Sequence, residues 1–437
     1  MEVLQDTYKD TKIGRIPKDW EVTTLYEIRK QSDRYSFTGG PFGSDLKSSD
    51  YTDSGVRIIQ LGNIGEGSFI DKSKIYTSEE KANQLISCNV YPNDIILAKM
   101  APVARSCKVP SSSLRYVMCS DGIRLAVDTE KVDDNFIFHS LQDRRFRASA
   151  ERSMVGTTRG RIGLNDLRNL LIPFPPLAEQ QKIAAILSSV DEQISTTDKI
   201  IEKSKELKKG LMQKLFSEGI GHTEFKDTKI GRIPKDWEVV LMKSVCEIKG
   251  GYSFKSNLFK SEGKYQVIRI GNLYGGQLDL NRSPAFIEET DKKYEDFLLK
   301  ENDLISTMTG TVGKRDFGFI VKIDKEENLF LNQRVCRMRA LMINSDFLYF
   351  SCSTTQYLDQ FFLQATGGTG NQVNIGTTHI GKIKIALPPL PEQQKIAAIL
   401  SEADAKIEME QTQKTQLEQL KKGLMQQLLT GEKRVKV

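Results

Sequence analysis

Long apolar segments are absent from this 437-residue sequence. No run of about 18 consecutive apolar residues occurs, so the sequence predicts no membrane-spanning helix. The first 15 residues, MEVLQDTYKDTKIGR, also lack the apolar centre of a secretory signal peptide. These absences favour a soluble protein of the cytoplasm.

Residue types that bind metals are few and poorly spaced. The six cysteines form no CxxC pair, and the three histidines are scattered at His139, His222 and His379. A structural zinc site needs Cys and His ligands at short, regular spacings. We therefore expect no metal site, and we expect the cysteines to be reduced thiols.

Catalytic signatures are missing too. The phosphate-binding pattern GxxxxGK[ST] does not occur. FPPL at residues 174–177 and LPPL at residues 387–390 resemble the (N/D)PP(Y/F) loop of amino-methyltransferases, but neither has the leading Asn or Asp or the closing aromatic residue. Proline at these places is more typical of a break before a helix. We expect no catalysis by this chain and no cofactor of its own.

The charges of the two signs are nearly balanced. Lys and Arg number 63 against 57 Asp and Glu, which gives a net charge of +6. This mild excess is compatible with a nucleic-acid partner but argues against a histone-like coating protein.

What the sequence does contain is a long internal repeat. Residues 9–22 read KDTKIGRIPKDWEV, and residues 226–239 repeat all 14 letters. A second block, PPLAEQQKIAAILSSVDEQI at residues 175–194, returns at residues 388–407 with 15 of 20 positions unchanged. Repeats this long exceed any solenoid unit, which indicates two copies of one domain type.

Between the repeated blocks the two halves diverge, apart from short echoes such as IQLGN at residues 59–63 and IRIGN at residues 268–272. Both middles contain β-branched runs of strand length separated by Gly, Asn, Asp, Ser and Pro, which predicts compact α+β domains. One scaffold would therefore present two different surfaces. We place globular domains at residues 1–174 and 219–387, and helical regions at residues 175–218 and 388–437.

The helical regions show an apolar heptad pattern, with alternating steps of four and three residues. Alone, such a stripe has nothing to pack against, so we expect the two helices to pair. We expect an antiparallel pair, because a parallel one would crowd both domains at one end and lose the pseudo-two-fold symmetry. The predicted contacts of the helix pair and of subunits docked on it are Ile183, Leu187, Val190, Ile194, Ile396, Leu400 and Ile407.

Glycine-bearing polar loops recur at equivalent places in the two middles. GGPFGSDLK at residues 39–47 corresponds to KGGYSFKSN at 249–257, and GTTRGRIG at 156–163 corresponds to GGTGNQVNIG at 367–376. TMTGTVGKR adds a loop at residues 307–315. Their N–H groups, hydroxyls and cations suit phosphates, and Arg, Asn and Gln suit base edges, although a solvated turn explains any one loop about equally well. The candidate DNA contacts are Phe42, Ser44, Lys47, Arg159, Arg161, Tyr252, Lys255, Thr309, Thr311, Lys314, Arg315, Asn371 and Gln372.

The order of these blocks resembles the S (specificity) subunit of type I restriction–modification systems. The resemblance rests on IPKDWE, a variable domain, and PPLxEQQKIAAIL followed by a helix, all of which occur twice across almost the whole chain. It implies that each variable middle is a target recognition domain for one half of a split, asymmetric DNA sequence. The implied fold is α+β, with two recognition domains separated by an antiparallel coiled coil of two long helices.

The resemblance also implies partners and their cofactors. Two modification (M) subunits would dock on the helical regions, bind S-adenosylmethionine and methylate adenine. Restriction (R) subunits would join the complex and use ATP and Mg. This chain would bind double-stranded DNA, would catalyse nothing itself and would not contact a membrane.

Two other functions stay open. A self-sufficient DNA adenine methyltransferase with a duplicated body would need the (N/D)PP(Y/F) loop that is missing here. A coiled-coil adaptor without DNA recognition would leave the different loops of the two middles without a purpose.

Overall fold

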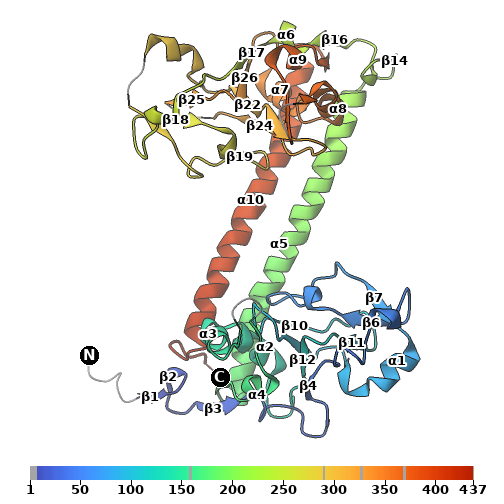
Figure 1. The fold of residues 1–437 in the computed structure, drawn as a ribbon, viewed down its shortest axis with the longest axis vertical. Helices are drawn as coiled ribbons and strands as arrows, with labels where there is room; N and C mark the ends of the chain where they lie inside the picture. The colour runs from blue at the N-terminus through green and yellow to red at the C-terminus, as the bar shows by residue number, and fades with distance from the viewer. Residues whose placement is uncertain (1–6, 157–159, 289–290, 325–327, 368–370, 437) are drawn as a thin grey trace. The chain divides into compact units, whose positions relative to one another are not determined.

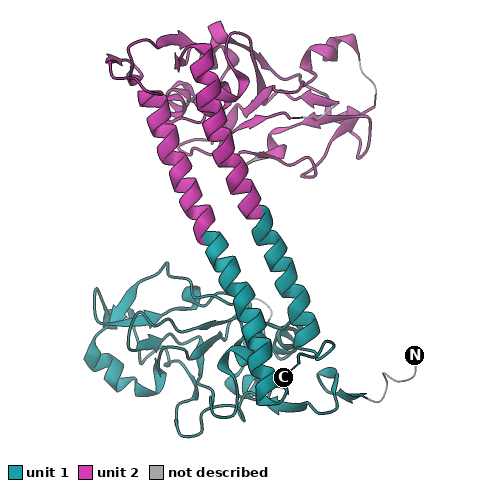
Figure 2. Cartoon of the chain, turned by 180° about the vertical axis from the view of Figure 1, so that it is seen from behind, with its two compact units in different colours: residues 1–198, 412–437 teal, residues 199–411 magenta. Residues whose placement is uncertain are grey.

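In the computed structural model, the chain forms two compact units (Figure 1). Unit 1 comprises residues 1–198 and 412–437, and unit 2 comprises residues 199–411 (Figure 2). Each unit holds one globular α+β domain and parts of both long helices, so the expected α+β fold with an internal duplication is confirmed. The structure describes residues 7–156, 160–288, 291–324, 328–367 and 371–436.

The two long helices are α5 (Leu177–Glu218), with 42 residues, and α10 (Leu390–Leu428), with 39 residues. Each begins at a proline-rich break, because proline fits the first turn of a helix but not its interior. Helix α5 begins in unit 1 and ends in unit 2, whereas α10 begins in unit 2 and ends in unit 1 (Figure 2). Each unit therefore contains the start of one helix and the end of the other. Among the described residues, no helix combines the length and apolar character that a membrane span requires.

The domain of unit 1 is built on two small sheets, with strand orders β10-β9-β12-β4 and β5-β7-β6-β11-β8. All neighbouring strands are antiparallel except β6 and β11, which are parallel. The strands are β4 (Phe37–Gly39), β5 (Tyr51–Thr52), β6 (Val56–Ile59), β7 (Ile75–Thr77), β8 (Asn89–Val90), β9 (Ile95–Ala98), β10 (Ser106–Lys108), β11 (Tyr116–Met118) and β12 (Gly122–Leu125).

The domain of unit 2 repeats this topology. Its first sheet has the order β17-β26-β22-β24, and its second has the order β21-β18-β25, again with one parallel pair, β18 and β25. Short repeated segments mark equivalent strands. NDII at residues 93–96 leads into β9, and NDLI at residues 302–305 leads into β22. The strands are β17 (Cys246–Gly250), β18 (Tyr265–Ile268), β21 (Phe286–Ile287), β22 (Leu304–Thr307), β24 (Ile320–Lys322), β25 (Leu329–Leu331) and β26 (Val335–Ala340).

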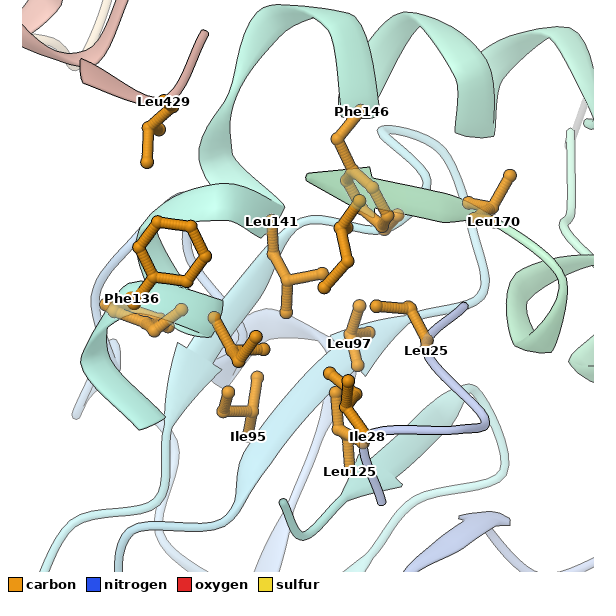
Figure 3. Close-up of a cluster of buried hydrophobic side chains, with 14 of the residues drawn as sticks. Leu25, Ile28, Ile95, Leu97, Leu125, Phe136, Leu141, Phe146, Leu170 and Leu429 are labelled. Atoms are coloured by element: carbon orange, nitrogen blue, oxygen red, sulfur yellow. The ribbon is translucent and has the colours of Figure 1, made fainter. Parts of the chain in front are cut away.

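The core of unit 1 lies between its first sheet and two helices, α2 (Asp134–Gln142) and α3 (Arg144–Arg152). Strands β9 and β12 are buried along their whole length. β9 is wholly apolar, whereas β12 contains Arg124, whose buried guanidinium pairs with Asp94. Leu429, from just after α10, is buried in the same core, so both ends of the chain contribute to unit 1. Figure 3 shows core side chains from the sheet, the helices and the loops, including Ile95, Leu97, Leu125, Phe136, Leu141, Phe146 and Leu429.

A repeated contact fixes the start of α5 to the domain of unit 1. The buried indole N–H of Trp20 donates to the carboxylate of Glu179 at 2.9 Å. The next residue, Gln180, accepts a hydrogen bond from the backbone N–H of Asp133 at 3.0 Å and donates to the carbonyl oxygen of Pro175 at 2.8 Å. The repeated EQ pair therefore satisfies buried polar groups of the domain while it starts the helix.

Unit 2 forms the same contacts with the second copies of these residues. Trp237 donates to Glu392 at 2.9 Å. Gln393 accepts from the backbone N–H of Asn344 at 2.9 Å and donates to the carbonyl oxygen of Pro388 at 2.8 Å. These three polar contacts that anchor α5 to unit 1 thus have counterparts that anchor α10 to unit 2.

The segment that follows the other long helix completes each cluster with a cation or an imidazole. In unit 1, Arg434 donates to Glu179 at 2.7 Å and forms a bidentate pair with Asp19. These hydrogen bonds raise the pKa of Arg434. In unit 2, the ring of His222 lies 2.9 Å from the carboxylate of Glu392.

The helices run antiparallel within unit 1, as the sequence predicted. Lys421 of α10 pairs with Asp191 of α5 at 2.6 Å, and Lys414 pairs with Asp198 at 2.7 Å. From Asp191 to Asp198 the residue number on α5 rises by seven, while that of the paired lysine on α10 falls by seven. The two helices therefore run antiparallel.

Two lysines interrupt the apolar heptad pattern of the long helices. Lys421 and its repeat counterpart Lys208 both continue the alternating steps of four and three residues. In unit 2, Lys208 of α5 binds Asp404 of α10 at 2.5 Å. This ion pair is the repeat equivalent of the Lys421–Asp191 pair, with the lysine on α5 instead of α10. The long lysine stems can pack along the seam while the amines reach a carboxylate at its edge.

The predicted contact residues of the helix pair fall into two groups. The first group is fully buried in the cores of the globular domains and comprises Ile183 and Leu187 in unit 1 and Ile396 and Leu400 in unit 2. The second group lies further along the helices, outside those cores, and comprises Val190, Ile194 and Ile407. The first turns of each helix therefore anchor it to its own domain, a role that the heptad pattern alone did not reveal.

His139 of unit 1 is a buried histidine, and a phenylalanine takes its place in unit 2. Its Nε2 lies 3.1 Å from the hydroxyl of Ser188, and its Nδ1 lies 3.8 Å from Asp191. Burial lowers the pKa of His139 to about 4, although Asp191 partly opposes this effect. Phe350 of α7 (Ser345–Ser351) occupies the equivalent position in unit 2, since Phe136 and Phe347 align in the same two helices.

We expect the variant His139→Phe to resist acid better than the wild-type protein. Because the folded state lowers the pKa below the ordinary 6.5, folding keeps the imidazole neutral; this contribution is complete above pH 6.5 and is lost as the pH falls toward 4. The difference in unfolding free energy between variant and wild type should grow by about 3 kcal/mol from pH 7.5 to pH 4. Chemical denaturation across this range measures it, with Phe350→His as the reciprocal control that should become acid-labile. A constant difference would show that folding does not lower the pKa of His139.

Candidate nucleic-acid interface

A glycine fixes the base of the first candidate loop in each unit. A Cβ atom on Gly40 would lie 1.8 Å from the carbonyl oxygen of Cys119, and one on Gly251 would lie 2.1 Å from that of Asn332. No side chain fits at either place, since real Cβ atoms do not approach backbone so closely. The repeated GG pair therefore holds both loops against the turn that precedes β12 in unit 1 and β26 in unit 2.

In unit 2, a small sheet joins two loops that are about 60 residues apart in sequence. Thr309 pairs with Asn374, and Thr311 pairs with Gln372. The TMTGTVGKR segment and residues 371–374 therefore form a single surface. Its strands are β23 (Thr309–Thr311), β27 (Thr366–Gly367) and β28 (Gln372–Asn374), in the order β23-β28-β27.

Unit 1 has the same arrangement in a shorter form. Arg161 bridges Met100 on one side and Val155 on the other, as Asn374 bridges Thr309 and Thr366 in unit 2. The backbone N–H of Ile162 also donates to the carbonyl oxygen of Lys99 at 2.9 Å. Arg161 and Asn374 therefore occupy equivalent positions.

We call these regions the loop surfaces. The loop surface of unit 1 comprises residues 40–47, 99–100, 120–121 and 160–161. The loop surface of unit 2 comprises residues 251–257, 309–315 and 371–374.

The two loop surfaces present different chemistry at their equivalent centres. Arg161 is 61% exposed, and its guanidinium lies 3.4 Å from the carboxylate of Asp121. In unit 2, the hydroxyl of Thr309 donates to the side-chain oxygen of Asn374 at 2.6 Å. Within the described part of the chain, the amide N–H groups of Asn374 have no acceptor. Arginine favours the acceptor edge of guanine, whereas asparagine favours the mixed edge of adenine.

The loop residues predicted in unit 1 are exposed. Phe42 is 82% exposed, which is unusual for an aromatic side chain. Ser44 donates to Asp45 at 3.3 Å, and the backbone N–H of Lys47 donates to Asp50. Arg159 lies outside the described residues. DNA contact by these side chains remains a prediction.

The residues predicted in unit 2 have mixed environments. Lys255, Lys314, Asn371 and Gln372 are exposed, and Thr311 is half-buried. The ring of Tyr252 instead packs within an aromatic cluster, 5.0–5.2 Å from Phe254, Tyr294 and Phe297. That cluster contributes to the satellite core of the domain.

Arg315 also differs from the other predicted contacts of unit 2. Its guanidinium binds Asp359 of α8 (Thr355–Gln364) at 2.7 Å and lies over the ring of Phe362. Arg315 therefore has an intramolecular partner, whereas Lys314 has none within the described residues.

Three residues of the loop surfaces were not predicted from the sequence. Lys99 donates to the carbonyl oxygen of Ser120 at 3.2 Å and lies against Gly39, at the base of the first loop. Asp121 faces Arg161, and Asn374 is the counterpart of Arg161. The repeated segments NDII and NDLI were the sequence signal for Lys99. Each segment leads into a strand, β9 or β22, and the chain reaches the loop surface where that strand ends.

The described residues contain no group of three or more His, Cys, Asp or Glu side chains placed to hold a metal ion. Five of the six cysteines are buried and all are unpaired. Burial raises the pKa of Cys107, Cys246 and Cys336 to about 12, so these thiols are poor nucleophiles. The chemistry available at the loop surfaces is hydrogen bonding and charge.

The chain belongs to the family of type I restriction–modification DNA specificity domains, whose model matches it twice, at residues 17–206 and 234–419. It is 30% identical over 443 aligned residues to the type I restriction enzyme MjaVIII specificity subunit of Methanocaldococcus jannaschii, covering 99% of this chain and 97% of that protein. It is 22% identical to the EcoKI specificity subunit of Escherichia coli, covering 88% and 82% of the two chains.

Solved structures support the fold. The S subunit of a type I restriction–modification system from M. genitalium superposes with a TM-score of 0.58 at 18% identity, covering 94% of this chain and 96% of that one. A chain from a structural study of the assembly and conformational transition of the type I system superposes with a TM-score of 0.54 at 16% identity, with coverages of 96% and 99%.

We expect Gly40→Ala to destabilise unit 1 by about 2 kcal/mol or more, because the new Cβ overlaps the carbonyl oxygen of Cys119. Gly43→Ala is the matched control in the same loop, since nothing lies within 4 Å of its Cβ position. This control should change stability by less than about 0.5 kcal/mol. Thermal unfolding of both variants measures the contrast. Equal stabilities would show that the loop base is not held as described.

Proposed function

We propose that this chain is the DNA-recognition subunit of a type I restriction–modification complex. Each recognition domain reads one half of an asymmetric, bipartite sequence in double-stranded DNA. The observation that carries this proposal is the contrast between Arg161 and Asn374, which occupy equivalent positions in two domains of one topology. Because these side chains favour different base edges, the two half-sites should differ in sequence.

The backbone of the loop surfaces supports a second, sequence-independent contribution. Glycine-bearing loops with exposed N–H groups, Ser or Thr hydroxyls and lysines suit phosphate oxygens, which position a protein on a duplex. Lys47 and Lys314 are exposed, and neither is paired with a carboxylate in the described residues. Bound DNA would bring phosphate oxygens within reach of these amines.

The proposed partners of the helices are two M subunits. Leu207 on α5 and Leu420 on α10 are 62% and 51% exposed, and they occupy equivalent positions of the repeated LKKGLMQ block. Exposed leucines on a helix are suited to a partner's apolar surface. One such leucine in each unit provides two equivalent docking sites for two identical subunits, and R subunits would join through them.

Catalysis is assigned to the partners. S-adenosylmethionine would bind the M subunits, while ATP and Mg would serve the R subunits, and this chain would act without a cofactor in the cytoplasm. The proline-rich segments support this division, since FPPL connects β13 (Leu171–Phe174) directly to α5 and LPPL connects β29 (Lys384–Leu387) to α10. Both segments therefore make a strand-to-helix turn.

We expect exchange of one domain to change one half of the recognised sequence. Residues 23–172 are suited to exchange, because β3 (Glu21–Thr24) pairs with β13 and places both junctions side by side. The measurement is mapping of methyl-adenine after assembly of the chimaera with its M subunits. Changes in both halves would contradict independent reading, and methyl transfer by this chain alone would contradict the non-catalytic assignment.

The reciprocal exchange provides the control. Strands β16 (Glu238–Leu241) and β29 pair in the same way, so residues 240–385 can be replaced at equivalent junctions. This chimaera should alter only the other half of the sequence. The two exchanges together also distinguish a recognition subunit from an adaptor, because an adaptor would show no sequence change in either.

Leu207→Glu and Leu420→Glu should each reduce the number of bound M subunits from two to one. Both side chains are exposed, so the substitutions leave the fold intact while they place a charge in the proposed contact. Native mass spectrometry of the assembled complex counts the subunits, and the double variant should bind none. Retention of two M subunits by the double variant would place the docking site elsewhere.

A further inference from the structure

A cavity of about 1060 Å³ lies within unit 1. Its walls come from β2 (Gly14–Pro17), from the first turn of α3 and from the last turns of α10. None of its lining residues belongs to the loop surface of unit 1. The cavity is therefore a separate feature of the unit.

The lining is rich in cations from three elements. It contains six cationic side chains and four carboxylates. The cations are Arg15, Arg144, Arg145, Arg147, Lys421 and Lys422.

Most of the carboxylates already have partners. Asp143 caps α3 and accepts from Arg145, and Glu418 lies 3.7 Å from Lys414. Glu66 lies 3.6 Å from Arg147.

Three of the cations have no carboxylate partner among the residues that the structure describes. They are Arg15, Arg144 and Lys422, which come from three different elements. The guanidinium of Arg15 lies 5.2 Å over the ring of Tyr8. The positive charge of the cavity is therefore only partly neutralised within the chain.

Arg147 adds a desolvated charge. Its side chain is 17% exposed, and its nearest carboxylate, on Glu66, is itself 71% exposed. Burial lowers the pKa of Arg147, which shows that the charged form is poorly stabilised by its surroundings. An anion in the cavity would stabilise it.

Unit 2 lacks this cluster of arginines. Its helix α8 is the counterpart of α3, since Asp143 and Thr354 cap the two helices at equivalent positions. The residues at the positions of Arg144, Arg145 and Arg147 are Thr355, Gln356 and Leu358. A feature needed only for folding of the repeated domain would be expected in both copies.

We propose that this cavity binds a phosphate-rich ligand of about nucleotide size. Guanidinium groups match phosphate oxygens in a planar, bidentate geometry, and lysines add point charges. The volume lies at the upper end of small-molecule sites, which span about 300–1,000 Å³. Met425, Tyr8 and the side-chain stems of the cations supply apolar surface beside the charges.

Titration calorimetry of the full chain with sodium tripolyphosphate tests the proposal. The double variant Arg144→Thr/Lys422→Gln should bind at least tenfold more weakly, because it removes two unpaired cations and uses the threonine of unit 2. Lys209→Gln is the matched control, since Lys209 is the repeat counterpart of Lys422 on α5 and does not line the cavity. This control should bind as the wild type does. No binding by the wild type, or equal weakening in both variants, would overturn the proposal.

Competition identifies the source of the phosphates. ATP that displaces tripolyphosphate indicates a free nucleotide, whereas displacement by a 5′-phosphorylated oligonucleotide and not by ATP indicates a nucleic-acid backbone. Either result supports the site if the double variant abolishes it. Displacement that persists unchanged in the double variant would place the ligand elsewhere and contradict the proposal.

Discussion

The hydrogen bond between a buried indole N–H and the glutamate of the repeated EQ pair is the interaction on which each unit depends. It joins the IPKDW motif at the start of a domain to the first turn of the helix that leaves it, as Trp20 to Glu179 and as Trp237 to Glu392. An indole N–H left without its acceptor would cost about 1–3 kcal/mol, and a buried carboxylate without donors would cost more. Both partners must therefore be present together.

This interdependence explains why the repeat is strict in some blocks and absent in others. Residues 9–22 and 226–239 form the contacts that close each domain on its helix, so identical contacts need identical residues. The middles only have to complete the sheets, and buried strands such as β9 (IILA) and β22 (LIST) do so with different residues. Loops at the strand ends neither close a domain on its long helix nor complete its core sheets. Their residues can therefore differ, as Arg161 and Asn374 do at equivalent positions.

The units are equivalent in topology but not in charge. His139 and the arginines of α3 belong only to unit 1, where unit 2 has Phe350 and uncharged residues. The equivalent contacts suit two copies of one partner. The differences suit ligands that bind once, such as an asymmetric DNA sequence or a single anion.

The sequence predicted the duplication, the long helices and their antiparallel pairing, because these follow from exact repeats and from an apolar period that needs a partner. It also indicated the equivalent glycine-bearing loops at residues 39–47 and 249–257, but not the close backbone approach at Gly40 and Gly251. It did not reveal that Ile183 and Leu187 pack on a domain, because a heptad pattern does not say which surface buries it.

The candidate site was only partly predictable for a similar reason. Asn374 was missed because the strand register in unit 2 decides which loop residue takes the position equivalent to Arg161, and register is not visible in a diverged segment. Tyr252 was chosen for its residue type, yet its ring packs among Phe254, Tyr294 and Phe297. Whether an aromatic residue in a loop is exposed depends on distant side chains.

Selection of binding sequences from random duplexes, using the chain assembled with its M subunits, tests the central claim most directly. Two domains of one topology with different loop surfaces should select two short, dissimilar half-sites separated by positions of no preference. A single continuous sequence, or two identical half-sites, would contradict the account.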